Sequence, residues 1–298
     1  MMTHTPIFKG IATALITPMH ADGSVDYEAF GKLIDWQIEC GIDALVIAGT
    51  TGEGSTLTDE EHRQVIRFSV ERAAHRIPII AGTGSNDTAY ACDLTRFSAE
   101  VGADAMLVVT PYYNKATQNG LVKMFNAIAD SSDKPIIAYN VPSRTGCAIA
   151  PATYAKLAEH PNIVAIKEAN GDIGAIVETA ALVGDKMDIY SGNDDQIVPV
   201  MSMGGVGCIS VLSNILPRET KQICTLFEQG DVKGAAALQC KLLPLIKALF
   251  SEVNPIPVKA AMAKMGLCSP AIRLPLTEME EAHAEILYAR MREAGIDV

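Results

Sequence analysis

Short apolar runs recur along the first two thirds of the chain at intervals of roughly 30 residues, and helical patterns separate them. The stretch 26–40 is typical of these helices, because its apolar side chains fall three or four residues apart and Gly41 follows it. The runs themselves are nearly continuous in apolar residues, as expected for parallel strands that are covered on both faces. The eight runs lie at 10–17, 44–48, 77–81, 105–109, 135–138, 163–168, 187–190 and 206–211.

Eight strand–helix repeats predict an α/β fold, the (β/α)8 or TIM barrel. Polar and aromatic residues gather where each run ends, which matches the rim on which such barrels carry their active sites. Beyond residue 217 the pattern becomes wholly helical. Because an ordinary barrel needs about 250 residues or fewer, we expect a barrel with a catalytic rim over 1–217 and a C-terminal helical extension, 218–298, packed on it. The candidate helices of the extension lie at 218–229, 232–250, 257–265 and 277–294.

Two of the expected helices begin with the spacing of a capping box, in which a Ser or Thr and a Glu three residues later bind each other's backbone N–H groups. Thr58 and Glu61 have this spacing at the start of the helix after the second run. Thr277 and Glu280 have it at the start of the last candidate helix. We therefore expect both helices to begin at these positions.

The composition limits the partners and the location of the protein. A formal net charge of −11 argues against nucleic-acid binding. The seven cysteines are scattered and the six histidines show no metal-ligand spacing, so we expect reduced thiols, a cytoplasmic location and no metal site. The first residues lack the pattern of a signal peptide. The uncharged stretch 196–217 contains Pro, Gly and Ser residues, so we expect a helix, a turn and a buried strand there and no membrane partner.

One lysine stands at the end of the sixth run, where Ile163-Val164-Ala165-Ile166 precedes Lys167. Apolar surroundings disfavour the charged ammonium, and a neutral amine can attack a ketone to form a Schiff base. The residues themselves leave a simpler alternative open, in which Lys167 pairs with Glu168 or extends to water.

Further polar groups follow the neighbouring runs. Tyr139 ends the fifth run, so a barrel wound in order places its phenol beside Lys167, where it could transfer protons; alternatively it packs in the core. Arg144 follows in the next loop and could bind a carboxylate through two hydrogen bonds, or it is a solvated charge. The segment Gly49-Thr50-Thr51-Gly52 follows the second run and could hold a carboxylate with its hydroxyl and N–H groups, or form a plain turn.

Taken together, these motifs resemble the dihydrodipicolinate synthase family, a branch of the pyruvate-dependent class I aldolases. The similarity runs from about Gly10 to Leu276. A lysine and a tyrosine alone would mark only the wider aldolase group, whereas the paired threonines and the Arg144 loop favour the synthase branch. The resemblance is carried by Gly49-Thr50-Thr51-Gly52-Glu53, Pro111-Tyr112-Tyr113-Asn114, residues 139–146, Ile166-Lys167-Glu168-Ala169 and residues 254–259.

The resemblance implies a lyase that condenses pyruvate with L-aspartate 4-semialdehyde in the diaminopimelate route to lysine. It also implies a homotetramer built from two tight dimers. A Schiff base is itself an electron sink, so no metal or nucleotide cofactor is implied. The implied catalytic residues are Lys167, Tyr139, Thr50 and Tyr113, the last reaching into the site of a neighbouring subunit, and the implied substrate-binding residues are Thr51, Arg144, Gly192 and Ile209.

Many members of this family bind free lysine at a regulatory site on the dimer interface, and the resemblance implies a degenerate version of it here. Asn86, His62 and Tyr112 match the family's residues, whereas Tyr90 replaces the ammonium-binding Glu and Asp59 replaces a histidine. A phenol brings no full charge to offset the desolvation of the ligand's ammonium. We expect Asp59 to lie in the first turn of its helix, where backbone N–H groups engage it. We therefore expect a weak response to lysine.

Two other functions remain open from the sequence. A sister aldolase, such as N-acetylneuraminate lyase or a keto-deoxy sugar acid aldolase, would share Lys167 and Tyr139 and would not require Arg144. A barrel that binds a keto acid without turnover would have no physical reason to keep these three residues together with Thr50 and Tyr113. Turnover with aspartate semialdehyde, compared with sugar aldehydes, separates these functions.

Overall fold

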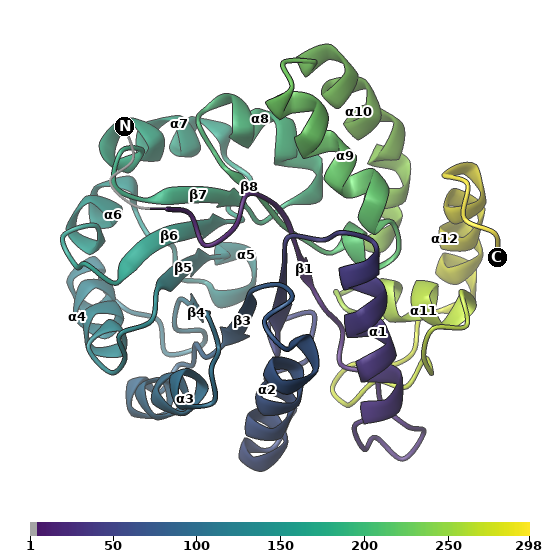
Figure 1. Ribbon diagram of the computed structural model, residues 1–298, viewed down its shortest axis with the longest axis horizontal. Coiled ribbons are helices and arrows are strands. Elements are labelled where there is room, and N and C mark those ends of the chain that lie inside the picture. The colour runs from purple at the N-terminus through teal and green to yellow at the C-terminus, as the bar shows by residue number, and fades with distance from the viewer. Residues whose placement is uncertain (1–4) are drawn as a thin grey trace.

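The computed structural model describes residues 5–298. Its eight parallel strands close into a barrel in sequence order, and β8 returns to pair with β1 (Figure 1). The predicted (β/α)8 fold is confirmed. The strands are β1 (Gly10–Ala14), β2 (Ala44–Ile47), β3 (Ile79–Gly82), β4 (Ala105–Val109), β5 (Ile136–Asn140), β6 (Ile163–Glu168), β7 (Asp188–Ser191) and β8 (Gly207–Ser210).

Helices surround the barrel and connect its successive strands (Figure 1). The predicted capping box at Thr58 is confirmed: Thr58 Oγ1 accepts from the Glu61 N–H at 3.2 Å, and the Glu61 carboxylate accepts from the Thr58 N–H at 2.9 Å. The helices between and after the strands of the barrel are α1 (Tyr27–Glu39), α2 (Asp59–Ala73), α3 (Thr88–Glu100), α4 (Gln118–Ala129), α5 (Pro142–Thr145), α6 (Pro151–Leu157), α7 (Ile173–Val183) and α8 (Ile197–Ser202), with 3₁₀ turns η1 (Asp194–Gln196) and η2 (Leu212–Asn214).

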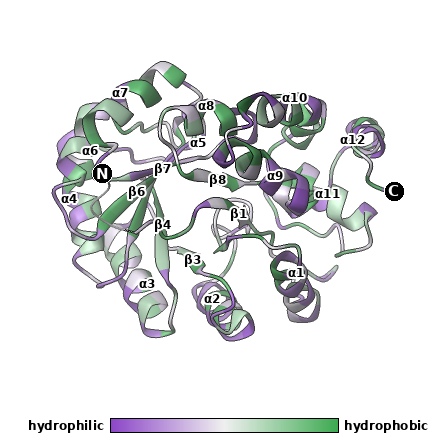
Figure 2. Ribbon diagram, turned by 45° about the horizontal axis from the view of Figure 1, so that its top comes forward, coloured by the Kyte–Doolittle hydropathy of each residue, from purple (hydrophilic) through white to green (hydrophobic). Residues whose placement is uncertain are grey.

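The core has two layers. Small and branched side chains such as Ala12, Ile80 and Ala165 fill the barrel interior, and a larger cluster lies between the strands and the helices. Figure 2 shows β6 in hydrophobic colours, while much of α2 and α12 is hydrophilic. The stretch 196–217 forms α8, a turn and the buried β8, as expected. Within residues 5–298, no helix combines the length and the apolar character needed to cross a membrane.

The C-terminal part contains α9 (Pro217–Glu228), α10 (Val232–Leu249), α11 (Ile256–Lys264) and α12 (Glu281–Glu293). The first three agree with the sequence prediction to within a residue at either end. Of these helices, α9 packs against β1 and α8, so it covers the barrel wall, while α10 packs on α9 and α12. We keep the division of the chain into 1–217 and 218–298 as a proposal.

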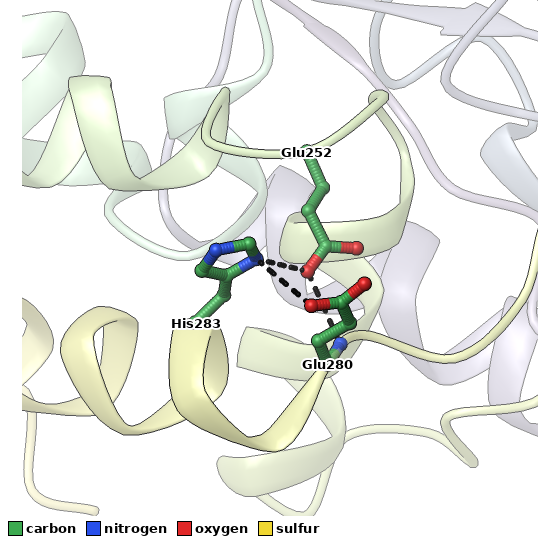
Figure 3. Close-up of side chains that lie close together, drawn as sticks. All are labelled: Glu252, Glu280 and His283. Atoms are coloured by element: carbon green, nitrogen blue, oxygen red, sulfur yellow. Dashed lines mark hydrogen bonds and ion pairs between the residues drawn. The ribbon is translucent and has the colours of Figure 1, made fainter.

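The start of α12 differs from the prediction. The helix begins at Glu281, and its N-cap residue Glu280 makes no side-chain capping bond, so the predicted capping box with Thr277 is wrong. Instead, Glu252 from the turn after α10 accepts from the Glu280 N–H at 3.1 Å and is hydrogen-bonded to His283 Nδ1 at 2.7 Å (Figure 3). A carboxylate distant in sequence therefore stabilises this helix end. The three side chains are also close enough together to hold a metal ion, but these hydrogen bonds already account for their arrangement.

Candidate active site

Lys167 and Tyr139 lie side by side at the carboxyl ends of β6 and β5, where they are register partners. Each side chain belongs to a residue only 6% exposed. The Lys167 Nζ lies 4.2 Å from the centroid of the Tyr139 ring. The ring therefore shields the amine from solvent, and the structure places amine and phenol as a barrel wound in order requires.

Glu168 faces the opposite side of β6, because successive side chains of a strand alternate. Its carboxylate accepts from the Asn140 side chain at 3.0 and 3.1 Å, from the Tyr154 hydroxyl at 2.9 Å and from the Asn170 N–H at 2.9 Å. Burial raises the pKa of Glu168 to about 7 despite these bonds. Among the described residues, Glu168 therefore has these partners and not Lys167, and the alternative of a Lys167–Glu168 pair is wrong.

A cavity of about 480 Å³ opens at this rim. Tyr139, Thr50 and Arg144 line it from separate parts of the chain, and Thr145 lies beside them. Lys167 is not among the lining residues, but its amine lies against the ring of Tyr139, which is. The cavity is large enough for a small keto acid next to the Tyr139 phenol and the Arg144 guanidinium.

Asn254 connects two of the predicted binding residues. Its side-chain amide donates to Thr51 Oγ1 at 3.0 Å, and its backbone carbonyl accepts from Arg144 Nη2 at 3.0 Å. Thr51 is buried, so this bond fixes the direction of its hydroxyl. Sequence reasoning did not name Asn254 as a site residue, although the segment 254–259 was part of the resemblance; no local pattern indicates that it reaches a loop near residue 50.

The loop that carries Thr50 and Thr51 has an unusual backbone. Ala48 and Glu53 adopt φ values of 54° each, in the left-handed region that non-glycine residues avoid. Gly54 N–H donates to Gly49 O at 3.2 Å and closes the loop. A Cβ on Gly54 would clash with the Ala48 carbonyl, so glycine is required there. The segment is therefore a tightly built turn and not a flexible connection.

Gly192 lies next to β6, the strand that carries Lys167. Ile209 lies inside the barrel. The Gly192 N–H donates to Glu168 O at 2.7 Å, and Ile209 belongs to the interior cluster. Asp194, two residues after Gly192, is buried and accepts from Ser210 Oγ and from the Leu212 N–H at 3.0 Å. Burial raises the pKa of Asp194. Sequence reasoning missed Asp194, whose only signal was its place after the seventh run.

The two adjacent tyrosines after β4 have different surroundings. Tyr112 lines the cavity, whereas Tyr113 is 92% exposed and has a φ of 70°. Within one protomer, the structure does not bring Tyr113 together with Lys167 and Tyr139.

Three residues of the expected regulatory site line the same cavity. His62, Tyr90 and Tyr112 line it, and Asn86 lies close by, its carbonyl accepting from Asn114 Nδ2 at 2.9 Å. His62 Nε2 is hydrogen-bonded to Gly82 O at 2.9 Å, and burial lowers the pKa of His62.

Asp59 is the first residue of α2, as expected, but a side chain and not the backbone engages it. Its carboxylate accepts from Arg63 Nε at 2.9 Å. This bond, with a further one to the Tyr90 hydroxyl, lowers the pKa of Asp59. Burial, assisted by Asp59, raises the pKa of Tyr90 to about 12, so the phenol stays neutral.

Comparisons of the sequence and of the structure with known proteins both match one protein family. The sequence pattern of the Dihydrodipicolinate synthetase family matches residues 7–294. A 4-hydroxy-tetrahydrodipicolinate synthase of Lachnoclostridium phytofermentans is 55% identical over 291 residues, which is 97% of this chain and 99% of the relative. The crystal structure of dihydrodipicolinate synthase from Aquifex aeolicus superposes with a TM-score of 0.95 at 46% identity, covering 97% of this chain and 99% of that one.

A further structural relative is a dihydrodipicolinate synthase variant described as the first monomeric one. It has a TM-score of 0.95 at 40% identity and covers 98% of both chains. The agreement extends over nearly the whole length in each comparison. The chain therefore belongs to the dihydrodipicolinate synthetase family.

Proposed function

We propose that this chain condenses pyruvate with L-aspartate 4-semialdehyde to form 4-hydroxy-tetrahydrodipicolinate, through a Schiff base on Lys167. The observation that carries the proposal is the buried Lys167 amine against the Tyr139 ring, beside a cavity that Thr50 and Arg144 line. Family membership supports it, since a relative 55% identical bears the name of this synthase. The reaction is an aldol-type carbon–carbon bond formation followed by ring closure.

The first half of the reaction forms the enamine. The Lys167 amine attacks the ketone carbon of pyruvate, and the resulting carbinolamine loses water to give an iminium ion. Tyr139 transfers protons to and from the oxygen that leaves. The iminium withdraws electrons from the adjacent methyl group, which loses a proton and becomes the enamine carbon. The electrons are held on the Schiff base, so these steps need neither a metal nor a nucleotide.

The second half builds and releases the product. The enamine carbon attacks the aldehyde carbon of the second substrate, and the aldehyde oxygen takes up a proton. The amino group of the same substrate then attacks the iminium carbon and closes the ring. The carbon–nitrogen bond to Lys167 breaks, and the free amine is regenerated.

Pyruvate is an anion and aspartate semialdehyde carries a carboxylate, while the protein carries a formal charge of −11. Local groups must therefore hold the carboxylates against an unfavourable overall field. Thr51 and Thr50 bind the pyruvate carboxylate through hydroxyl and N–H groups, and backbone groups at Gly192 and Ile209 line the site. Arg144 binds the carboxylate of aspartate semialdehyde through a charge-assisted hydrogen bond.

The active enzyme is a homotetramer of two tight dimers in this proposal. Its support is Tyr113, an aromatic side chain 92% exposed on the protomer, which would enter the partner's site and extend the proton relay from Thr50 and Tyr139. All seven cysteines are free, which suits a reducing compartment, and we place the enzyme in the cytoplasm.

We further propose that the regulatory lysine site is degenerate. A lysine ligand needs an anion for its side-chain ammonium, since burying that charge unpaired is expensive. Tyr90 supplies a neutral phenol, and Asp59 is already bound by Arg63. Asn86, His62 and Tyr112 remain, but these side chains supply no full negative charge.

Borohydride trapping tests the proposed function. The protein is incubated with pyruvate, reduced with borohydride and digested, and the peptides are analysed by mass spectrometry. A reduced pyruvyl group is expected on Lys167 and not on Lys259, which is the matched control because it is also buried, at 1% exposure of its side chain. Turnover with aspartate semialdehyde but not with sugar aldehydes is then expected. Unmodified protein, or label on another lysine, contradicts the proposal.

A further inference from the structure

A buried ion pair links the Thr50–Thr51 loop to α11. Glu53 in the loop and Lys259 on α11 form it, and their side chains are 2% and 1% exposed. The Lys259 Nζ also donates to Ala271 O at 2.8 Å, and the Glu53 carboxylate accepts from the Arg273 N–H at 3.2 Å. Neither charge takes part in the reaction steps above.

The pair is not explained by stability alone. Taking two charges out of water is expensive, and an apolar pair of similar volume is often at least as stable as a buried ion pair. Burial lowers the pKa of Lys259, which shows the direction of this cost. Glu53 also has a φ of 54°, a conformation that persists only where its surroundings hold it. The pair therefore stabilises one particular backbone conformation of the loop.

The segment that carries Lys259 touches the loop at a second point. Asn254 lies just before α11 and donates to Thr51 Oγ1, and its carbonyl accepts from Arg144. The two anchors hold the loop at Thr51 and at Glu53, on either side of Gly52. Within the loop, the Glu53 N–H donates to Thr50 O at 3.1 Å, so a shift of Glu53 moves the Thr50 carbonyl as well.

We propose that Glu53 and Lys259 are positioning residues for pyruvate, which deepens the proposed function and rests on it. The pair fixes the backbone of Thr50 and Thr51 in the conformation that receives the pyruvate carboxylate. Lys259 also neutralises the negative charge of Glu53, which lies only two residues after Thr51, the proposed ligand of the pyruvate carboxylate. Without Lys259, a buried anion would both loosen the loop and repel the substrate.

Two variants separate these effects. Lys259→Met keeps the volume but leaves the Glu53 charge unpaired. Glu53→Gln/Lys259→Met removes both charges and retains an acceptor for the Arg273 N–H. In the single variant we expect kcat/KM for pyruvate to fall about 100-fold, since misplacing a binding group by about 1 Å can cost this much. In the double variant we expect partial recovery, with the pyruvate KM still raised, Lys167 trapping slowed and the KM for aspartate semialdehyde changed less.

Melting temperature is measured for every variant, and Asp35→Asn is the control, because it breaks surface ion pairs to Arg72 and Arg76 far from this loop in the sequence. The control should retain wild-type kinetics. If Lys259→Met does not fold, the pyruvate KM and the trapping rate of Glu53→Gln/Lys259→Met test the proposal. A folded double variant with wild-type pyruvate KM and trapping rate overturns the inference, as does a loss of activity that only follows the loss of folded protein. Failure of trapping in the wild-type protein instead overturns the proposed function.

Discussion

Replacing Glu168 by glutamine should change how the stability of the protein depends on pH. Burial holds the pKa of this carboxyl at about 7, compared with an ordinary value of 4.5. The folded state therefore binds the Glu168 proton more tightly than the unfolded chain does. Between pH 4.5 and 7 the folded state carries the extra proton, so this group makes the free energy of unfolding fall as the pH rises.

The size of the effect follows from the same values. Each unit of pKa is worth about 1.4 kcal/mol, so a rise from 4.5 to about 7 corresponds to about 3 kcal/mol of unfolding free energy. The loss is complete above about pH 7, where the carboxyl is ionised in both states. Glu168 is only 2% exposed, so solvent screens little of this amount. The hydrogen bonds from Asn140 and Tyr154 oppose it, and burial dominates.

Urea unfolding measures this effect, followed by circular dichroism at fixed protein concentration between about pH 4.5 and 8. The amide introduced by Glu168→Gln does not titrate, so the stability of this variant minus that of the wild type should rise by about 3 kcal/mol over this range. Glu28→Gln is the control, because Glu28 is exposed and pairs with Lys32 one helix turn away; an exposed ion pair contributes little to stability, so its difference should change far less than that of Glu168→Gln. A flat difference for Glu168→Gln over this range refutes the reasoning, because a pKa held at or below its ordinary value of 4.5 would leave the stability almost independent of this group there.

Three further outcomes follow from the proposed chemistry. Arg144→Ala should raise the KM for aspartate semialdehyde about 10- to 100-fold, since losing a charged hydrogen bond costs about 1.5–3 kcal/mol; an equal loss of pyruvate trapping would contradict the assignment. Tyr113→Phe and Lys167→Ala subunits, each inactive alone, should regain partial activity when mixed, and no recovery in verified hybrid dimers would place Tyr113 in its own subunit. Free lysine should inhibit weakly in an initial-rate titration with pyruvate near its KM; strong inhibition below millimolar lysine would show that Tyr90 does not disable the site.

The barrel and the centre of its site were accessible from the sequence because they depend on local patterns. Apolar runs separated by helical stretches predict parallel strands in order. In such a barrel, residues that end consecutive strands are neighbours, so Tyr139 and Lys167 had to meet. The capping box at Thr58 and Glu61 also uses groups three residues apart, and it formed as predicted.

The errors came from contacts between distant parts of the chain and from side chains that took other partners. At Thr277 the capping pattern was present, but Glu252 from another segment binds the helix start, and α12 begins later. For Asp59, a salt bridge to Arg63 replaced the expected backbone contact. In the folded protein, local hydrogen-bond partners of a side chain compete with partners that are distant in sequence. Spacing along the sequence identifies only the local ones.

The same limit explains why the inner support of the site was missed. Asn254 lies 203 residues from Thr51, and no periodic pattern joins the two. Yet this bond and the Glu53–Lys259 pair come from one short segment of the C-terminal extension. If the chain is divided at residue 217, as we propose, the barrel supplies the reacting groups and the extension supplies the contacts that hold their substrate loop. On the proposed roles of Thr50 and Thr51, a barrel cut off before this segment would keep Lys167 and Tyr139 but would lack the two contacts, from Asn254 and from Lys259, that order the pyruvate-binding loop.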